Sequence, residues 1–196
     1  MFSIFGKRDH IEAFWTWFAD NRHHLLGSEP PDARVISQFG SRLRKIHPGL
    51  VFEVDLQHTP RSFVVSADGD RELFPTVKDV VARAPQFDNI GVLAFRQPSP
   101  GDVSIQLRDR TLSSNALWFE SAVAAGGISL KVYIPGLSAS NEDELSHAAF
   151  MLTDNALGEH FMTLAVADLA FAPLPPDPAS LGLHPFSEIP RLVQAP

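Results

Sequence analysis

The segment from Arg61 to Gln97 constrains the fold more than any other part of the chain. An apolar run at 63–65 leads into the turn sequence Ser66-Ala67-Asp68-Gly69; a helical pattern then covers 75–84, and a second apolar run covers 90–95. This order predicts strand, turn, helix and strand. The second run is apolar at both odd and even positions, which is typical of a strand covered on both faces. We therefore expect residues 90–95 to form the central strand of a sheet.

A hairpin is predicted immediately before this helix. Residues 50–57 alternate between apolar and polar side chains, as expected for a strand with one buried and one solvated face. A turn containing Pro60 joins them to the strand that begins at Arg61, so the two strands should pair. The resulting order over 50–97 is ββαβ.

The same order is predicted in the second half of the chain. A hairpin covers 117–134 around Gly126-Gly127, a helix follows over 141–157 and ends at Gly158, and a last strand covers 161–171. The recurrence of the ββαβ order at 116–171 leaves a structural duplication open as one interpretation. A chance recurrence stays open as the alternative, because the two halves share few identical residues.

Helices and an arm complete the expected fold. Amphipathic patterns predict two helices near the N-terminus, at 9–26 and 32–46, and seven prolines interleaved with large apolar residues predict an extended arm over 172–196. We expect a single α+β domain at 1–171, with a mostly antiparallel sheet on which the two N-terminal helices and the arm pack.

Composition excludes several functional classes. The chain lacks cysteine, so disulfides, thiolate zinc sites and cysteine nucleophiles are excluded. Sixteen basic and twenty-three acidic side chains give a net charge of −7, which disfavours nucleic acid and anionic membranes as partners. No secretory signal or membrane-spanning run is apparent, so we expect a cytoplasmic location. No pattern indicates an oligomeric state.

Arg96 is the first candidate site residue, because it is a cation that leaves the most apolar segment. Such a guanidinium needs either a carboxylate partner, for which Asp68 is placed, or a bound anion. Ser66 lies close by in the sequence and could be read as a nucleophile. It lacks the flanking glycines of a nucleophile elbow, however, and an Asp-Gly turn explains the same residues. We therefore place Arg96, Asp68 and Ser66 together as candidate ligand-binding residues.

Glu159 and His160 are the second candidate pair. With Asp154, and with His147 further upstream, they could in principle hold a metal. The spacing departs from tight metal motifs, and Gly158 should end the helix between Asp154 and Glu159. The structural interpretation is that these polar side chains form hydrogen bonds with backbone groups at the helix end. We expect neither a metal nor a cofactor.

Several short motifs together carry a resemblance that spans most of the chain. Ser66, Phe74-Pro75, Ala84-Pro85, Ala94-Phe95-Arg96-Gln97 and Leu157-Gly158-Glu159 resemble a family of small bacterial proteins of uncharacterised function. The resemblance implies a bacterial cytosolic protein and brings neither an activity nor a catalytic residue.

The sequence favours binding over catalysis. We expect a non-catalytic binding or protein-interaction module that neutralises or escorts a protein partner, because the scaffold is evident and no catalytic constellation is. The alternative hypothesis is a hydrolase or metal-dependent enzyme that uses Asp154, Glu159, His160 and Arg96.

Overall fold

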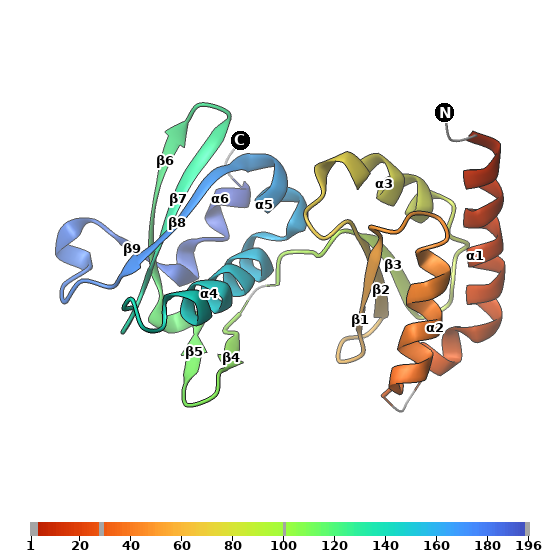
Figure 1. The fold of residues 1–196 in the computed structure, drawn as a ribbon, viewed down its shortest axis with the longest axis horizontal. Helices are drawn as coiled ribbons and strands as arrows, with labels where there is room; N and C mark the ends of the chain where they lie inside the picture. The colour runs from red at the N-terminus through yellow and green to blue at the C-terminus, as the bar shows by residue number, and fades with distance from the viewer. Residues whose placement is uncertain (1–3, 28–29, 100, 195–196) are drawn as a thin grey trace. The chain divides into compact units, whose positions relative to one another are not determined.

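The structure is a computed structural model that describes residues 4–27, 30–99 and 101–194 (Figure 1). It divides into two compact units, Met1–Arg96 and Gln97–Pro196. The single domain over 1–171 stays a prediction, and each unit is described by itself. The α+β class is confirmed, with more antiparallel than parallel strand pairs among the described residues.

Two helices open the first unit. Helix α1 spans Ile4–Leu25 and therefore begins before the predicted start at residue 9. Helix α2 spans Ala33–Leu43, and the Asp32 side chain caps it by accepting a hydrogen bond from the Val35 N–H at 2.8 Å. The two helices lie side by side (Figure 1).

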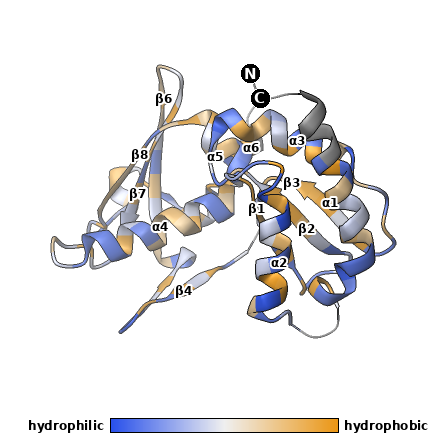
Figure 2. Ribbon diagram, turned by 45° about the vertical axis from the view of Figure 1, so that its right-hand side comes forward, coloured by the Kyte–Doolittle hydropathy of each residue, from blue (hydrophilic) through white to orange (hydrophobic). Residues whose placement is uncertain are grey.

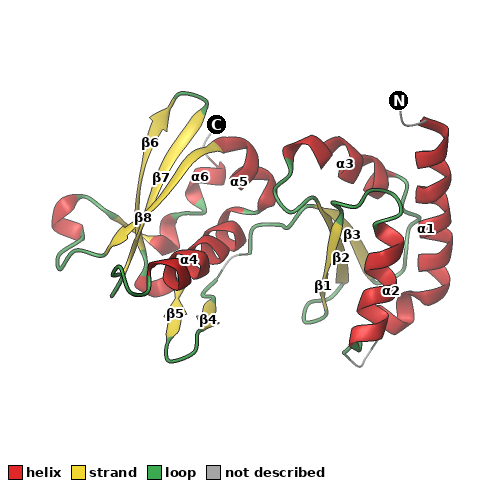
Figure 3. Ribbon diagram, viewed as in Figure 1, coloured by secondary structure: helices red, strands yellow, loops and turns green. Residues whose placement is uncertain are grey.

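The first sheet consists of β1 (Val51–Asp55), β2 (Arg61–Ser66) and β3 (Ile90–Ala94), with the short 3-10 helix η1 (Arg71–Leu73) and helix α3 (Phe74–Ala82) between β2 and β3 (Figure 3). Strand β1 pairs antiparallel with β2, and β3 pairs parallel with β2. The prediction of a central strand at 90–95 is therefore wrong: β2 is central in this sheet and β3 lies at one end. Leu93 on β3 is accordingly exposed.

An aromatic cluster joins the helices to this sheet. Ile11, Phe14, Trp15 and Phe18 follow the i, i+3, i+4, i+7 spacing of one helix face, and all four are buried. The Phe18 and Phe63 rings lie 4.7 Å apart, and the Trp15 indole donates a 2.8 Å hydrogen bond to the Val80 carbonyl of α3. Burial of this face fixes α1 and α3 on the side of the sheet to which Phe63 points.

The second unit begins with a small two-stranded sheet, β4 (Ser104–Gln106) with β5 (Thr111–Ser113), and continues through η2 (Ser114–Ala116). Its larger sheet has the order β8-β7-β6-β9. The bounds are Trp118–Ala124 for β6, Gly127–Ile134 for β7, Val166–Pro173 for β8 and His184–Pro185 for β9. Strand β6 pairs antiparallel with β7, and β8 pairs parallel with β7.

Helix α4 (Glu142–Leu157) covers one face of this sheet and ends at Gly158, as predicted. The strand predicted from residue 161 starts later, because α5 occupies Glu159–Ala165 and β8 begins at Val166. Both units therefore show an antiparallel hairpin, a helical crossover and a parallel strand beside the second hairpin strand. Whether the two units are a true structural repeat or a chance recurrence of one order stays open.

The predicted arm contributes to the second core. Its elements are η3 (Ala179–Leu181), β9, η4 (Phe186–Glu188) and α6 (Arg191–Gln194). Phe186 and Ile189 are buried in the same cluster as Leu130, Val132 and residues of α4, so this part of the arm is packed. None of the helices in the described residues combines the length and the apolar composition needed to cross a membrane.

Candidate functional site

Arg96 meets three oxygen atoms just beyond the end of β3. Its Nη1 atom lies 3.2 Å from Asp68 Oδ1, 3.2 Å from Ser66 Oγ and 3.3 Å from Glu53 Oε1. The pair predicted between Arg96 and Asp68 is thus present, and three of the five candidate residues are brought together. Glu53 was not among the candidates.

The backbone around the two strand ends builds this contact. Phe95 has a left-handed φ of +68°, which is rare for a bulky residue, and its N–H donates to the Val65 carbonyl at 2.8 Å. Asp68 also has a left-handed φ, of +51°, and its N–H donates to Ser66 Oγ at 2.9 Å. Because β2 and β3 are parallel, their carboxyl ends coincide, and Arg96 emerges beside the turn after Ser66.

The environment of the cluster suits an ion pair better than a catalytic group. The Ser66 hydroxyl is buried and accepts hydrogen bonds from the Asp68 N–H and from Arg96, so its described partners are both donors rather than a general base. The Arg96 side chain is 20% exposed, whereas that of Asp68 is 71% exposed. Asp68 therefore stays hydrated, and the buried ion pair considered from the sequence is a partly solvated one.

The candidates of the second unit differ in their burial. Gly158, with a φ of +76°, separates α4 from α5, and Glu159 is the first residue of α5. Glu159 and Asp154 are buried, whereas His160 and His147 are exposed. Within the described ranges, no group of three or more histidine and acidic side chains is placed to hold a metal ion. Arg96 belongs to the first unit and these residues to the second.

Charge is distributed unevenly between the two halves of the sequence. Residues 1–96 contain twelve basic and twelve acidic side chains, whereas residues 97–196 contain four basic and eleven acidic ones. The net charge of −7 therefore originates in the second half. Three of its acidic side chains, Glu142, Asp143 and Glu144, form the first turn of α4 and are exposed. Acidic groups at the N-terminus of a helix stabilise it by a favourable interaction with the helix dipole.

The outward side of α4 combines these acids with apolar side chains. Asp143, Glu144, His147, Phe150 and Met151 are all exposed, and helical spacing places them on one side of α4, opposite Leu145, Ala149 and Leu152. We call these five residues the α4 stripe. Phe150 is 43% exposed and Met151 48% exposed. The alternation of hydrophobic and hydrophilic residues along α4 is visible in Figure 2.

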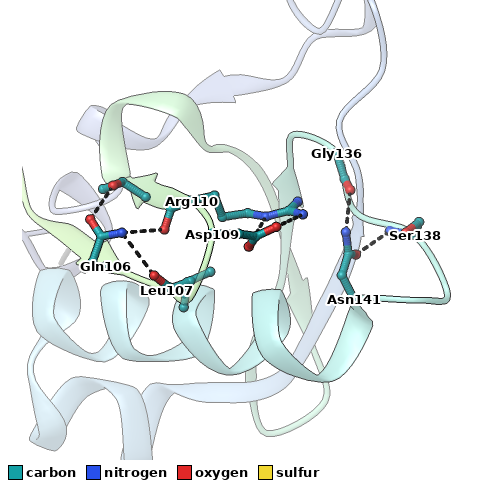
Figure 4. A network of polar contacts seen from close by, with 8 residues as sticks. Gln106, Leu107, Asp109, Arg110, Gly136, Ser138 and Asn141 are labelled. Atoms are coloured by element: carbon teal, nitrogen blue, oxygen red, sulfur yellow. Dashed lines mark hydrogen bonds and ion pairs between the residues drawn. The ribbon is translucent and has the colours of Figure 1, made fainter.

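The turn between β4 and β5 adds a paired arginine near the stripe. Asp109 and Arg110 are joined by two hydrogen bonds of 3.2 Å, and the arginine lowers the pKa of the Asp109 carboxyl below its usual value (Figure 4). Asp109, and to a smaller extent the charge of Glu144, raise the pKa of Arg110. This cation is therefore already compensated by acidic side chains.

The loop before α4 is held by its own hydrogen bonds. Asn141 donates to the Gly136 carbonyl at 3.0 Å and accepts from the Ser138 N–H at 2.8 Å (Figure 4). These bonds fix the loop that leads from β7 into the acidic first turn. The α4 stripe therefore follows directly after a loop whose backbone is held by hydrogen bonds.

Sequence reasoning missed the stripe and Glu53 for different reasons. Glu53 lies on the polar side of the predicted strand at 50–57, which was a usable signal, but its place beside Arg96 depends on the pairing of β1 with β2. Phe150 and Met151 stand in a helix whose other apolar residues are buried, and the same helical spacing could have separated them from that face.

Comparison with protein-family models, with curated proteins and with solved structures found no match for this chain in any of the three. A functional proposal therefore rests on the geometry and charge of the chain itself.

Proposed function

We propose that this protein is a non-catalytic interaction module that binds a positively charged protein partner through the α4 stripe and thereby neutralises or escorts that partner. The observation that carries the proposal is the position of two large exposed apolar side chains, Phe150 and Met151, next to an exposed acidic helix turn. Apolar side chains supply contact area in protein interfaces, and methionine adapts to differently shaped partners.

The charge of the second half selects the class of partner. Eleven acidic side chains against four basic ones create a negative field, which speeds the approach of a cationic protein and repels acidic ones. Arg110, whose pKa is raised in part by the charge of Glu144, is already engaged by Asp109. A partner that presents lysine or arginine around an apolar patch would match the stripe in both charge and hydrophobicity.

The enzyme hypothesis has weaker support. A hydrolase needs an activated nucleophile or a metal-bound water. Ser66 accepts hydrogen bonds from two donors, and His160 is exposed whereas its neighbour Glu159 is buried. These features favour a binding role for the chain.

Affinity capture with stripe variants tests the proposal. The wild-type chain is immobilised and exposed to an extract of its source cells, beside the double variants Phe150→Ser with Met151→Ser and Asp143→Lys with Glu144→Lys. We expect the wild type to retain a basic protein that both variants lose, because one variant removes the apolar contact and the other reverses the charge. The retained protein, once purified, should bind the wild type more weakly as salt rises.

Matched controls separate a local effect from a general one. Val123→Ser removes an apolar side chain that is 96% exposed outside the stripe, and Glu12→Lys with Glu72→Lys reverses two exposed acids of the first unit. Both controls should retain the partner. Equal capture by the stripe variants, or capture of acidic proteins alone, would contradict the proposal.

A further inference from the structure

A cavity of about 600 Å³ opens in the first unit at the C-terminal end of α1. Its walls come from three places: the last turns of α1, the start of β2 at Arg61, and the turn that leads into β3 at Ile90. Arg61 and Ile90 face each other in the register of the two parallel strands, so the cavity lies at their amino ends. Its volume lies in the range of about 300–1,000 Å³ that small-molecule sites occupy.

Two half-buried arginines line this cavity. Arg61 Nη1 donates to the Leu26 and Gly27 carbonyls, each at 2.5 Å, and so satisfies the carbonyls of the two residues that follow α1. Arg22 Nη1 donates to the Ala19 carbonyl, and its guanidinium lies 5.2 Å from the centre of the Phe87 ring. These contacts fix both side chains in place.

Each guanidinium keeps donors for a ligand. Arginine has five N–H groups on three nitrogens, and in both residues the described hydrogen bonds use Nη1 alone. No carboxylate of the described residues forms an ion pair with Arg22 or Arg61. Two positioned cations without a carboxylate partner, in one open cavity, suit a group with several negatively charged oxygens.

We propose that this cavity binds a small metabolite through an oxyanion, a phosphate or carboxylate group, which Arg22 and Arg61 hold together. His23 lines the same wall and can donate a further hydrogen bond to the anion. Asp20, Asp88 and Asn89 line the cavity as well, and their oxygens can accept from hydroxyl or amino groups on the rest of the ligand. A cavity much larger than one phosphate ion agrees with an organic ligand that carries the oxyanion.

Titration with simple oxyanions tests the site in the whole chain. Inorganic phosphate, pyrophosphate and citrate are added at constant ionic strength, and binding is followed by calorimetry and by the ring resonances of His23. We expect saturable binding by the wild type. The dissociation constants of Arg22→Gln and Arg61→Gln should be higher by about tenfold or more, because each variant loses charged hydrogen bonds. Tighter binding of pyrophosphate than citrate assigns a phosphate group, and the reverse order assigns a carboxylate.

Arg34→Gln is the matched control, because Arg34 is exposed on α2 and does not line the cavity. This variant should bind as the wild type does. Arg61→Gln also weakens the end of α1, so Arg22→Gln decides if the other variant does not fold. The proposal is overturned if the wild type binds none of the three probes saturably, or if Arg22→Gln binds as tightly as Arg34→Gln.

Discussion

Arg96 and Asp68 are 28 residues apart in the chain, and their side chains meet at 3.2 Å between Nη1 and Oδ1. The pair connects the end of β3 to the turn after β2, and Ser66 and Glu53 share the same guanidinium nitrogen. The exposure of the carboxylates limits how much this ion pair contributes to stability, because they can regain water when the cation is removed.

Replacement of Arg96 by methionine should therefore destabilise the fold only moderately. We expect a loss of about 1–3 kcal/mol in the free energy of unfolding, less than the loss for a fully buried ion pair, because Arg96 is mostly covered but Asp68 is not. Urea denaturation of the wild type and Arg96→Met measures the difference. An equally or more stable variant would contradict a structural role and favour ligand binding at Arg96.

Asp55 gives the unfolding free energy a dependence on acid pH. The N–H of Gln57 and then the side chain and N–H of His58 hydrogen-bond to its carboxylate, and together they lower the Asp55 pKa below 3.8. A carboxyl whose pKa is lowered by folding stabilises the fold at a pH above its pKa in the unfolded chain. This contribution is lost as the pH falls through its pKa in the folded chain.

Asp55→Asn should thus be less stable than the wild type at neutral pH, by no more than about 1 kcal/mol because the group is largely solvated. The difference should shrink as the pH is lowered below 3.8. Urea midpoints measured across this range test the sign. A difference that grows toward acid pH would contradict it, and Asp102→Asn, at an exposed carboxylate without a hydrogen bond in the described residues, serves as the control.

Phe186 tests whether the C-terminal segment contributes to the second core. Its side chain is buried among residues of that core, so Phe186→Ala should cost about 3–5 kcal/mol. Leu181 belongs to the same segment but is 65% exposed, and Leu181→Ala should change stability by less than about 0.5 kcal/mol. Thermal or urea unfolding of both variants measures the contrast. Similar midpoints for the two would show that the segment is not packed in solution.

Gly127 provides a test of close backbone packing at the start of β7. It has a φ of +151°, and a Cβ atom there would overlap the Ala165 carbonyl oxygen. Gly127→Ala should therefore destabilise the chain by about 2–4 kcal/mol. At Gly126, with a φ of +92°, a Cβ would meet nothing within 4 Å, so Gly126→Ala should cost about 1 kcal/mol. Equal losses in stability for both variants would exclude the overlap as the cause.

Local sequence patterns predicted where helices and strands lie better than they predicted which strands pair with one another. Period-two alternation located β1 and β7, and the glycine at 158 located the end of α4. The run at 90–95 was assigned to the sheet centre because it is apolar on both sides, yet strand order is set by pairing between distant segments. Four of the five residues at 161–165 are apolar and show no decisive period, and a helix forms where the pattern predicts a strand.

The candidate site was predictable to the extent that sequence neighbours determine it. Arg96 and Asp68 were paired because both follow strands that should be adjacent. The contact of Glu53 with Arg96 depends on the register of β1 against β2, which places Glu53 opposite Val64. No local signal in the sequence fixes that register. The cavity near Arg61 likewise unites three segments whose proximity arises only from the packing of α1 on the sheet.

The two ββαβ units differ in when each can be completed during synthesis. Every strand and helix of the first unit precedes residue 97, so its hydrophobic core is fully encoded before any of the second unit is translated. Domains generally fold as units as they leave the ribosome, N-terminal ones first. The second unit must wait for Phe186 and Ile189, because they fill its core beside strands made much earlier. During that interval the apolar side of the hairpin formed by β6 and β7 lacks part of its cover, and a nascent chain is then most exposed to aggregation or to chaperones.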